Sequence, residues 1–171
     1  MLEGQSLLDV ALGILRSHPY GFLATRAADG GSSVRLVQHL RVDDDATIWI
    51  GTSPRSRKVQ EIEGHAQASY SVEQRESFAY ATVAGPATIV SDVETRAELW
   101  EEGLRAFFPA GPEGDDFVVV RFRAQRIEMM DFAGSIHPQP YGLVPAVIER
   151  DGSTWRVAAA ERRPGPVQPE T

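Results

Sequence analysis

The chain has 171 residues, a formal net charge of −7 and no cysteine, which excludes disulfides, thiolate metal ligands and a cysteine nucleophile. The acidic balance argues against general nucleic-acid binding, because neutralising phosphates needs clustered lysine and arginine. No basic and apolar leader opens the sequence, and no apolar run approaches the roughly 20 residues of a membrane span. We therefore expect a cytoplasmic protein with no nucleic-acid or membrane partner.

Hydrophobic periodicity predicts short helices and strands without the alternation of parallel α/β proteins. The predicted helices cover residues 6–16, 53–64 and 92–108. The predicted strands cover residues 21–26, 34–42, 47–51, 66–72, 78–90 and 117–132. Strands 34–42 and 47–51 are separated by a short polar turn, so they can pair as a hairpin. This pattern predicts a mainly β (α+β) fold, an antiparallel barrel of six or seven strands with short flanking helices.

Details within the pattern predict local features. Gly85-Pro86 inside a strand indicates a bulge or a barrel corner. Beyond Gly134 the signal weakens, although runs 145–149 and 154–158 predict an extra hairpin. The polar, proline-rich residues 161–171 are expected to be disordered, which leaves residues 1–160 as one domain.

Cations gather where the second helix begins. Ser53 is expected as its N-cap, with Pro54 in the first turn, and Arg55, Arg57 and Lys58 follow directly. Positive side chains oppose the dipole at a helix start, whereas a bound phosphate is favoured there. The cluster therefore predicts an anion site to which hydroxyl groups contribute, and a solvated basic patch is the alternative. The hydroxyl-bearing residues are Thr52, Ser53 and Ser56.

Arg35 strengthens the anion hypothesis. It lies in an apolar strand, where an unpaired buried guanidinium would be costly. If residues 34–42 and 47–51 form a hairpin, Arg35 lies near the loop 52–58, and its charge converges with those of Arg57 and Lys58 on one small dianion. The alternative is an Arg35 that points into solvent.

These segments resemble the flavin-binding signature of pyridoxamine 5′-phosphate oxidase-like split-barrel proteins. The resemblance covers about residues 7–132, and two later segments resemble the general stress protein branch of that family. The signature segments are Arg35-Leu36-Val37, Trp49-Ile50-Gly51-Thr52 and Ser56-Arg57-Lys58-Val59. The general stress protein segments are Glu98-Leu99-Trp100 and Leu104-Arg105-Ala106-Phe107-Phe108-Pro109.

The resemblance implies a split-barrel homodimer with FMN at the subunit interface. It implies that the FMN phosphate is held by Arg35, Ser56, Arg57 and Lys58. Thr52 and Ser53 would contact the ribityl phosphate region, and Leu36 and Val37 would lie along the isoalloxazine with their backbone facing its polar edge. Trp100 of the facing subunit is a candidate for the cleft wall, and packing within its own subunit is the alternative.

Three departures argue against pyridoxamine 5′-phosphate oxidase activity. Leu40 stands where the oxidases have a substrate-binding lysine, and Tyr80 stands where they have a glutamine. No arginine stands two residues before His137, so their C-terminal Arg-x-His motif is absent. We expect no metal site and name no catalytic side chain, and His39 is interpreted as either a cleft residue or a core residue.

The expected function is that of an FMN-dependent oxidoreductase of the general stress protein type, with NADH, NADPH or another small molecule as electron donor. One alternative is a flavin carrier or sensor without turnover. Another is the same fold with the deazaflavin F420 or haem, and haem is disfavoured because the sequence shows no cluster of candidate haem ligands.

Overall fold

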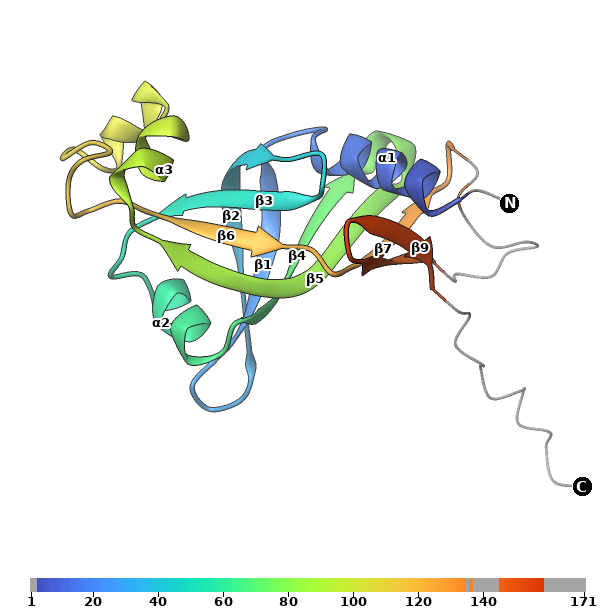
Figure 1. The fold of residues 1–171 in the computed structure, drawn as a ribbon, viewed down its shortest axis with the longest axis horizontal. Helices are drawn as coiled ribbons and strands as arrows, with labels where there is room; N and C mark the ends of the chain where they lie inside the picture. The colour runs from blue at the N-terminus through green and yellow to red at the C-terminus, as the bar shows by residue number, and fades with distance from the viewer. Residues whose placement is uncertain (1–2, 135, 137–144, 159–171) are drawn as a thin grey trace, which may run out of the picture.

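The computed structural model describes residues 3–134, 136 and 145–158, and this part of the chain is mainly β (Figure 1). Three α-helices and two short 3-10 helices accompany the strands. The strands are β1 Tyr20–Arg26, β2 Ser32–Val42, β3 Thr47–Thr52, β4 Gln67–Gln74, β5 Ala79–Val90, β6 Val118–Arg123, β7 Arg126–Asp131, β8 Ala146–Asp151 and β9 Thr154–Val157. The helices are α1 Gly4–Leu15, α2 Arg57–Gly64, α3 Val93–Glu98, η1 Arg75–Ser77 and η2 Glu102–Ala106.

Six antiparallel strands close into a barrel. Their order is β4-β1-β2-β3-β6-β5, and β5 pairs with β4 to complete the ring. Beyond β5 the sheet continues through β7, β8 and β9. The predicted barrel, the β2–β3 hairpin and the extra hairpin after Gly134 are all confirmed. The predicted tail 161–171 and His137 lie outside the described residues.

Strand β5 makes the corner that the sequence predicts at Gly85-Pro86. Up to this point it pairs with β4 and β7, and from Ala87 it pairs with β6. A Cβ atom on Gly85 would lie 2.2 Å from the carbonyl oxygen of Arg123, so only glycine allows this approach. The corner lets one strand belong to both halves of the barrel.

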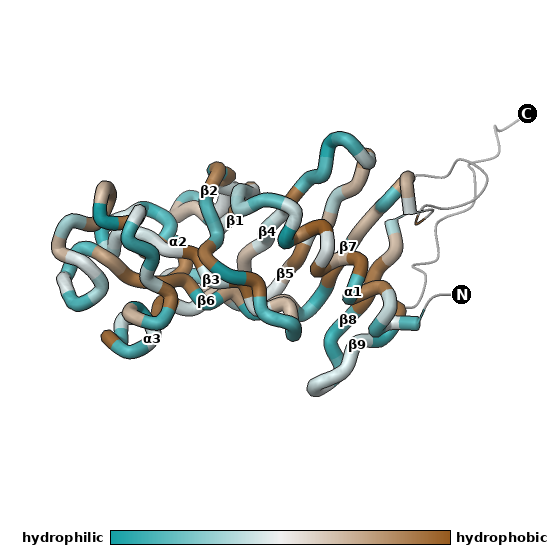
Figure 2. The backbone as a smooth tube through the Cα atoms, turned by 90° about the horizontal axis from the view of Figure 1, so that it is seen from above, coloured by the Kyte–Doolittle hydropathy of each residue, from teal (hydrophilic) through white to brown (hydrophobic). Residues whose placement is uncertain are grey.

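The core fills the barrel and continues under α1. Strands β4 and β5 alternate buried and partly exposed residues, as strands with one covered face do. Helix α1 packs its apolar face against β4, β5, β8 and β9. Figure 2 shows apolar segments running along the centre of the molecule. The largest fully buried side chains include Leu15, Leu23, Tyr70, Phe122, Ile127 and Met129.

Two long predicted elements are interrupted in the structure. The helix predicted over 92–108 ends at Glu98, and a separate 3-10 helix follows. Its predicted N-cap is correct, because the Asp92 carboxylate accepts a hydrogen bond from the Thr95 amide at 2.8 Å. The continuous helix was wrong because the chain leaves α3 at Leu99, where Leu99, Trp100 and Phe108 pack around Phe117 instead of continuing the helix.

The strand predicted over 117–132 is likewise two strands, β6 and β7. Residues 124 and 125 form a corner, where the Gln125 amide donates to the Ala84 carbonyl oxygen at 2.8 Å. The prediction missed this corner because neither residue is a glycine or proline. No helix in the described part of the chain is long and apolar enough to span a bilayer.

A polar pair is buried inside the barrel. His39 Nδ1 and the Tyr70 hydroxyl are hydrogen-bonded at 2.8 Å, and the two rings meet edge to face. Gly21 makes room for this pair, since a Cβ atom there would lie 2.4 Å from the Tyr70 hydroxyl. Burial, with a smaller contribution from His18, lowers the pKa of His39. His39 is therefore a core residue rather than a surface residue of a cleft.

The lowered pKa of His39 predicts that acid destabilises the fold. The unfolded chain binds a proton at His39 near the ordinary value of about 6.5, whereas the folded chain resists it, so stability falls as pH drops below that value. The melting temperature should therefore decrease from pH 7.5 to pH 5. His39→Gln keeps a hydrogen-bonding group beside Tyr70 but cannot titrate, so its decrease should be shallower. An equal decrease in both proteins would contradict the assignment.

Candidate functional site

The start of α2 lies at the end of strand β3. The helix begins at Arg57 with Ser56 as its N-cap, so the expected cap at Ser53 is wrong. Residues 53–56 form a turn first, in which the Ser56 amide donates to the Ser53 carbonyl oxygen at 3.0 Å. Ser53 also accepts a hydrogen bond from the Arg55 amide. The turn shifts the helix start by three residues and places Arg57 and Lys58 in its first turn.

Hydroxyl groups and an ammonium group meet at this helix start. The Thr52 hydroxyl donates to Ser56 Oγ at 3.2 Å and accepts from Lys58 Nζ at 2.9 Å. The Ser56 hydroxyl makes no capping bond to the helix, and among the described residues no side chain caps its first-turn amides. Uncapped amides at a helix start are donors that can bind an anion.

A buried carboxylate lies behind the helix start. Glu61 is 6% exposed, and Arg35 on β2 pairs with it at 2.6 Å from Nη2 to Oε2. The hydroxyls of Thr25 and Ser33 donate to the two Glu61 oxygens at 2.5 and 2.7 Å. The Thr25 hydrogen bond is the main cause that lowers the pKa of Glu61 to about 2, and Ser33 and Arg35 add to it. Glu61 is therefore a fixed negative charge.

Arg57 is the third cation of the cluster. Its Nε lies 3.5 Å from Glu61 Oε1, but 71% of its side chain is exposed. Burial lowers the pKa of Lys58, and the positive charges of Arg35 and Arg57 lower it further. The structure thus brings together the three cations that the sequence singles out.

The charge balance of this cluster fits a bound anion. Within the described residues, Glu61 is the carboxylate that pairs with Arg35 and Arg57, and Lys58 has no carboxylate partner. A half-buried ammonium beside two like charges is stabilised by an anion. Hydroxyls, uncapped amides and an ammonium together form the donor set that a phosphate group requires.

The matching family model is "Pyridoxamine 5'-phosphate oxidase like", and it matches residues 11–153. The chain belongs to this family. It has no match among curated protein sequences.

Solved structures share the fold of this pyridoxamine 5′-phosphate oxidase-like protein at low identity. A protein related to general stress protein 26 from Clostridium acetobutylicum is 18% identical, with 75% of this chain and 91% of that chain covered and a TM-score of 0.68. A pyridoxamine 5′-phosphate oxidase-related, FMN binding protein from Nostoc punctiforme is 17% identical, with 91% and 95% covered and a TM-score of 0.69. A heme binding protein from Mycobacterium smegmatis is 20% identical, with 72% and 53% covered and a TM-score of 0.58.

Strand β2 offers an open backbone edge at the site of this family member. Residues 32–38 pair with β1 on one side, whereas the described pairing with β3 begins only at His39. Leu36 is 59% exposed and Val37 is buried in the core, so the two side chains point to opposite faces. Along this edge the backbone donors and acceptors of residues 32–38 have no partner on β3 in the described pairing.

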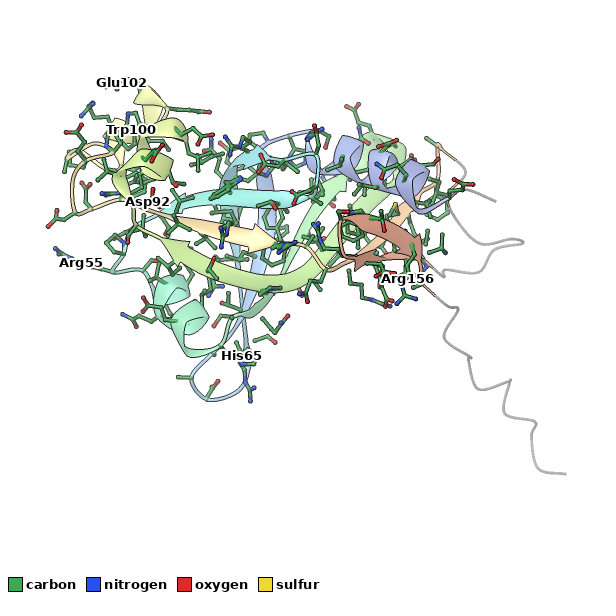
Figure 3. All side chains as sticks on the ribbon, in the orientation of Figure 1. Arg55, His65, Asp92, Trp100, Glu102 and Arg156 are labelled. Carbon is green, nitrogen blue, oxygen red and sulfur yellow. The ribbon has the colours of Figure 1, made fainter. Side chains whose placement is uncertain are left out.

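Trp100 packs against residues of its own chain. Its ring meets Phe117 edge to face at 5.1 Å, and its Nε1 donates to Glu102 at 3.3 Å. Figure 3 shows Trp100 in the α3 region and Arg55 at the outer end of the β3–α2 connection, directed away from the barrel. Arg55 therefore does not converge with the other cations. That Trp100 lines the wall of a flavin cleft formed with a facing subunit stays a prediction.

Sequence reasoning missed Glu61, which joins the cationic residues. Its signal was present: Glu61 follows Arg57 by one helical turn, between Val59 and Ile62, both of which are buried. An acid amid the buried side of a short helix indicates a buried partner. Arg35 is that partner.

Proposed function

We propose that this protein binds FMN as an oxidoreductase of the general stress protein type, with residues 1–160 as its FMN-binding domain. The carrying observation is Lys58, a half-buried ammonium at an uncapped helix start with two arginines nearby and no described carboxylate partner. The family membership and the fold shared with an FMN binding protein support the same ligand.

In this proposal the phosphate lies over the first turn of α2. Lys58 and Arg57 neutralise it, and the Ser56 hydroxyl, which accepts the Thr52 hydrogen bond, donates to it. The exposed Arg57 is free to turn from Glu61 toward the anion, because its 3.5 Å contact is loose. Arg35 keeps its pairing with Glu61 and offers its remaining N–H groups to the phosphate. Ser53 borders the ribityl phosphate region.

The ring would lie along the open edge of β2 at residues 36 and 37. Flavin, when bound, supplies hydride and electron transfer chemistry, and the protein supplies anchoring and orientation. Leu36 lends an apolar surface, and the strand backbone offers hydrogen bonds to a polar ring edge. No side chain of this site is assigned as an acid or base.

The outward face of β1 and β2 supports a homodimer. Phe22 and Leu36 are direct cross-strand neighbours, 52% and 59% exposed, and Tyr20 and Val34 extend the same face. Exposed apolar patches of this kind mark interaction surfaces. We propose that two copies pair through this face about a two-fold axis, so that flavin at the β2 edge lies between subunits.

Other ligands remain as distinct outcomes. The deazaflavin F420 is a second candidate, and haem is a third because a heme binding protein shares the fold. The absorption spectrum and mass of the released ligand distinguish them. The proposed compartment is the cytoplasm.

Loss of the two first-turn cations should release FMN. Arg57→Ala combined with Lys58→Ala removes two charged hydrogen bonds, which should cost on the order of 3 to 6 kcal/mol of binding free energy. Titration with FMN, followed by flavin fluorescence, measures this. Arg55→Ala is the matched control, because Arg55 is a neighbouring cation that points away from the site. Unchanged affinity in the double variant would reject the phosphate assignment.

The FMN-loaded protein should bleach when NADPH or NADH is added without oxygen. Reduction of the ring by hydride needs access and orientation rather than a dedicated protein acid. The measurement is loss of the visible flavin absorption over time. A flavin that stays oxidised with both nucleotides, and that dithionite still reduces, would favour a carrier or sensor instead.

A charge on the proposed interface should separate the subunits. Phe22→Asp with Leu36→Asp places two carboxylates on the β1–β2 face, so light scattering should give the mass of a monomer where the unmodified protein gives a dimer. Val93→Asp is the control, because Val93 is 47% exposed at the start of α3, where an acid is tolerated. A dimeric double variant would place the interface elsewhere.

A further inference from the structure

Glu61 is more deeply buried than any cation it contacts. Its side chain is 6% exposed, against 17% for Arg35 and 71% for Arg57. A buried carboxylate is costly unless several donors satisfy it. Here two hydroxyls and two guanidinium groups do so, and they come from β1, β2 and α2. These contacts fix the positions of the hydroxyl and guanidinium groups that surround Glu61.

Arg35 is the group that this arrangement fixes most strongly. Its Nη1 donates to the Thr25 hydroxyl and, at 3.4 Å, to the Leu23 carbonyl oxygen, and its Nη2 donates to Glu61. A guanidinium has five N–H groups, so these three bonds leave two donors in a fixed plane. The bond to Glu61 crosses from β2 to α2, and it therefore sets the orientation of Arg35 relative to the helix start.

We propose that Glu61 is a positioning residue of the anion site, which acts by holding Arg35 in place for the phosphate. This inference rests on the proposed phosphate site and adds a residue to it. Glu61 itself is not a ligand, since a carboxylate repels a phosphate. Glu61 orients Arg35, but it also places one negative charge near the bound anion.

These two effects have opposite signs, so a substitution separates them. Glu61→Gln removes the negative charge while nearly keeping the shape. If only charge mattered, the variant would bind a phosphate more tightly, because the three cations would lose their nearby carboxylate. If orientation dominates, the variant binds more weakly, because the amide nitrogen of the introduced glutamine cannot accept the hydrogen bonds of one former carboxylate oxygen.

The experiment is a double-mutant cycle on FMN affinity. The four proteins are the unmodified chain, Glu61→Gln, Arg35→Gln and the double variant, each titrated with FMN at pH 7.5. We expect Glu61→Gln to weaken binding on the order of tenfold, and the double variant to bind no more weakly than Arg35→Gln alone. This non-additivity is the signature of an effect that passes through Arg35.

Two results would overturn the inference. One is a folded Glu61→Gln protein whose affinity is unchanged or higher. The other is a double variant whose loss equals the product of the two single losses, because Glu61 would then act independently of Arg35. Melting temperatures of the ligand-free proteins test whether Glu61 has a purely structural role. Such a role would lower the melting temperature of Glu61→Gln, but the losses of FMN affinity caused by Glu61→Gln and Arg35→Gln would be independent of each other.

Thr25→Val replaces Glu61→Gln if that variant does not fold. The valine nearly keeps the side-chain shape but removes the hydroxyl that joins Arg35 to Glu61. It should weaken FMN binding several-fold, and this loss should vanish when Arg35 is already replaced by glutamine. A Thr25→Val loss that persists in the Arg35→Gln background would contradict the inference.

Inorganic phosphate distinguishes this inference from the FMN assignment. A protein that binds phosphate but not FMN rejects the FMN proposal, and the same four proteins then measure the coupling with phosphate as the probe. A protein that binds neither anion overturns the positioning role of Glu61 as well.

Discussion

The carboxylate of Glu61 connects the pieces that make the site. It accepts hydrogen bonds from β1 through Thr25 and from β2 through Ser33 and Arg35. Helix α2 carries this carboxylate and thereby docks against the barrel wall at a fixed distance from Arg35. Without that connection, α2 would be held to β1 and β5 by apolar contacts of Val59 and Ile62, which are not directional. Arg35 and helix α2, which carries Arg57 and Lys58, owe their relative placement to one buried negative charge.

This arrangement also resolves a conflict between stability and binding. Three cations close together repel one another, and this repulsion adds to burial, the larger cause, in lowering the pKa of Lys58. Glu61 offsets part of it while the anion is absent, so the fold tolerates the cluster. It is set back in the wall, 6% exposed, whereas Lys58 and the hydroxyl of Ser56 lie at the helix start. The Glu61 carboxylate thus reduces the repulsion among the cations from within the barrel wall, and the donors at the helix start stay available to the proposed anion.

The sequence predicted the framework well where the signals are local. Apolar alternation, short polar turns and Gly85-Pro86 report on nearby backbone, and the barrel, its hairpins and its corner followed. The clustering of Arg35 with residues 57 and 58 was predicted by assuming that strands 34–42 and 47–51 form a hairpin. The pairing of β2 with β3 confirms this hairpin. The role of Glu61 did not follow, because the local pattern indicates a buried acid but not its partners on β1 and β2, which lie 26 to 36 residues away. The breaks at 99–101 and 124–125 were missed for the same reason, since tertiary packing sets them.

The alternation of side chains between the two faces of strand β2 serves several purposes at once. Ser33, Arg35, Val37 and His39 face inward, and they pass in order from the buried carboxylate to the apolar core and the buried Tyr70. Val34 and Leu36 face outward with Phe22 on β1 and form the apolar surface proposed for the dimer. Besides its two faces, β2 has a backbone edge that is left open, because β3 pairs with it only from His39 onward. A shift of one residue in the register of β2 would put Arg35 on the apolar surface and Leu36 against Glu61, so the proposed anion binding, ring contact and dimerisation all depend on the same register.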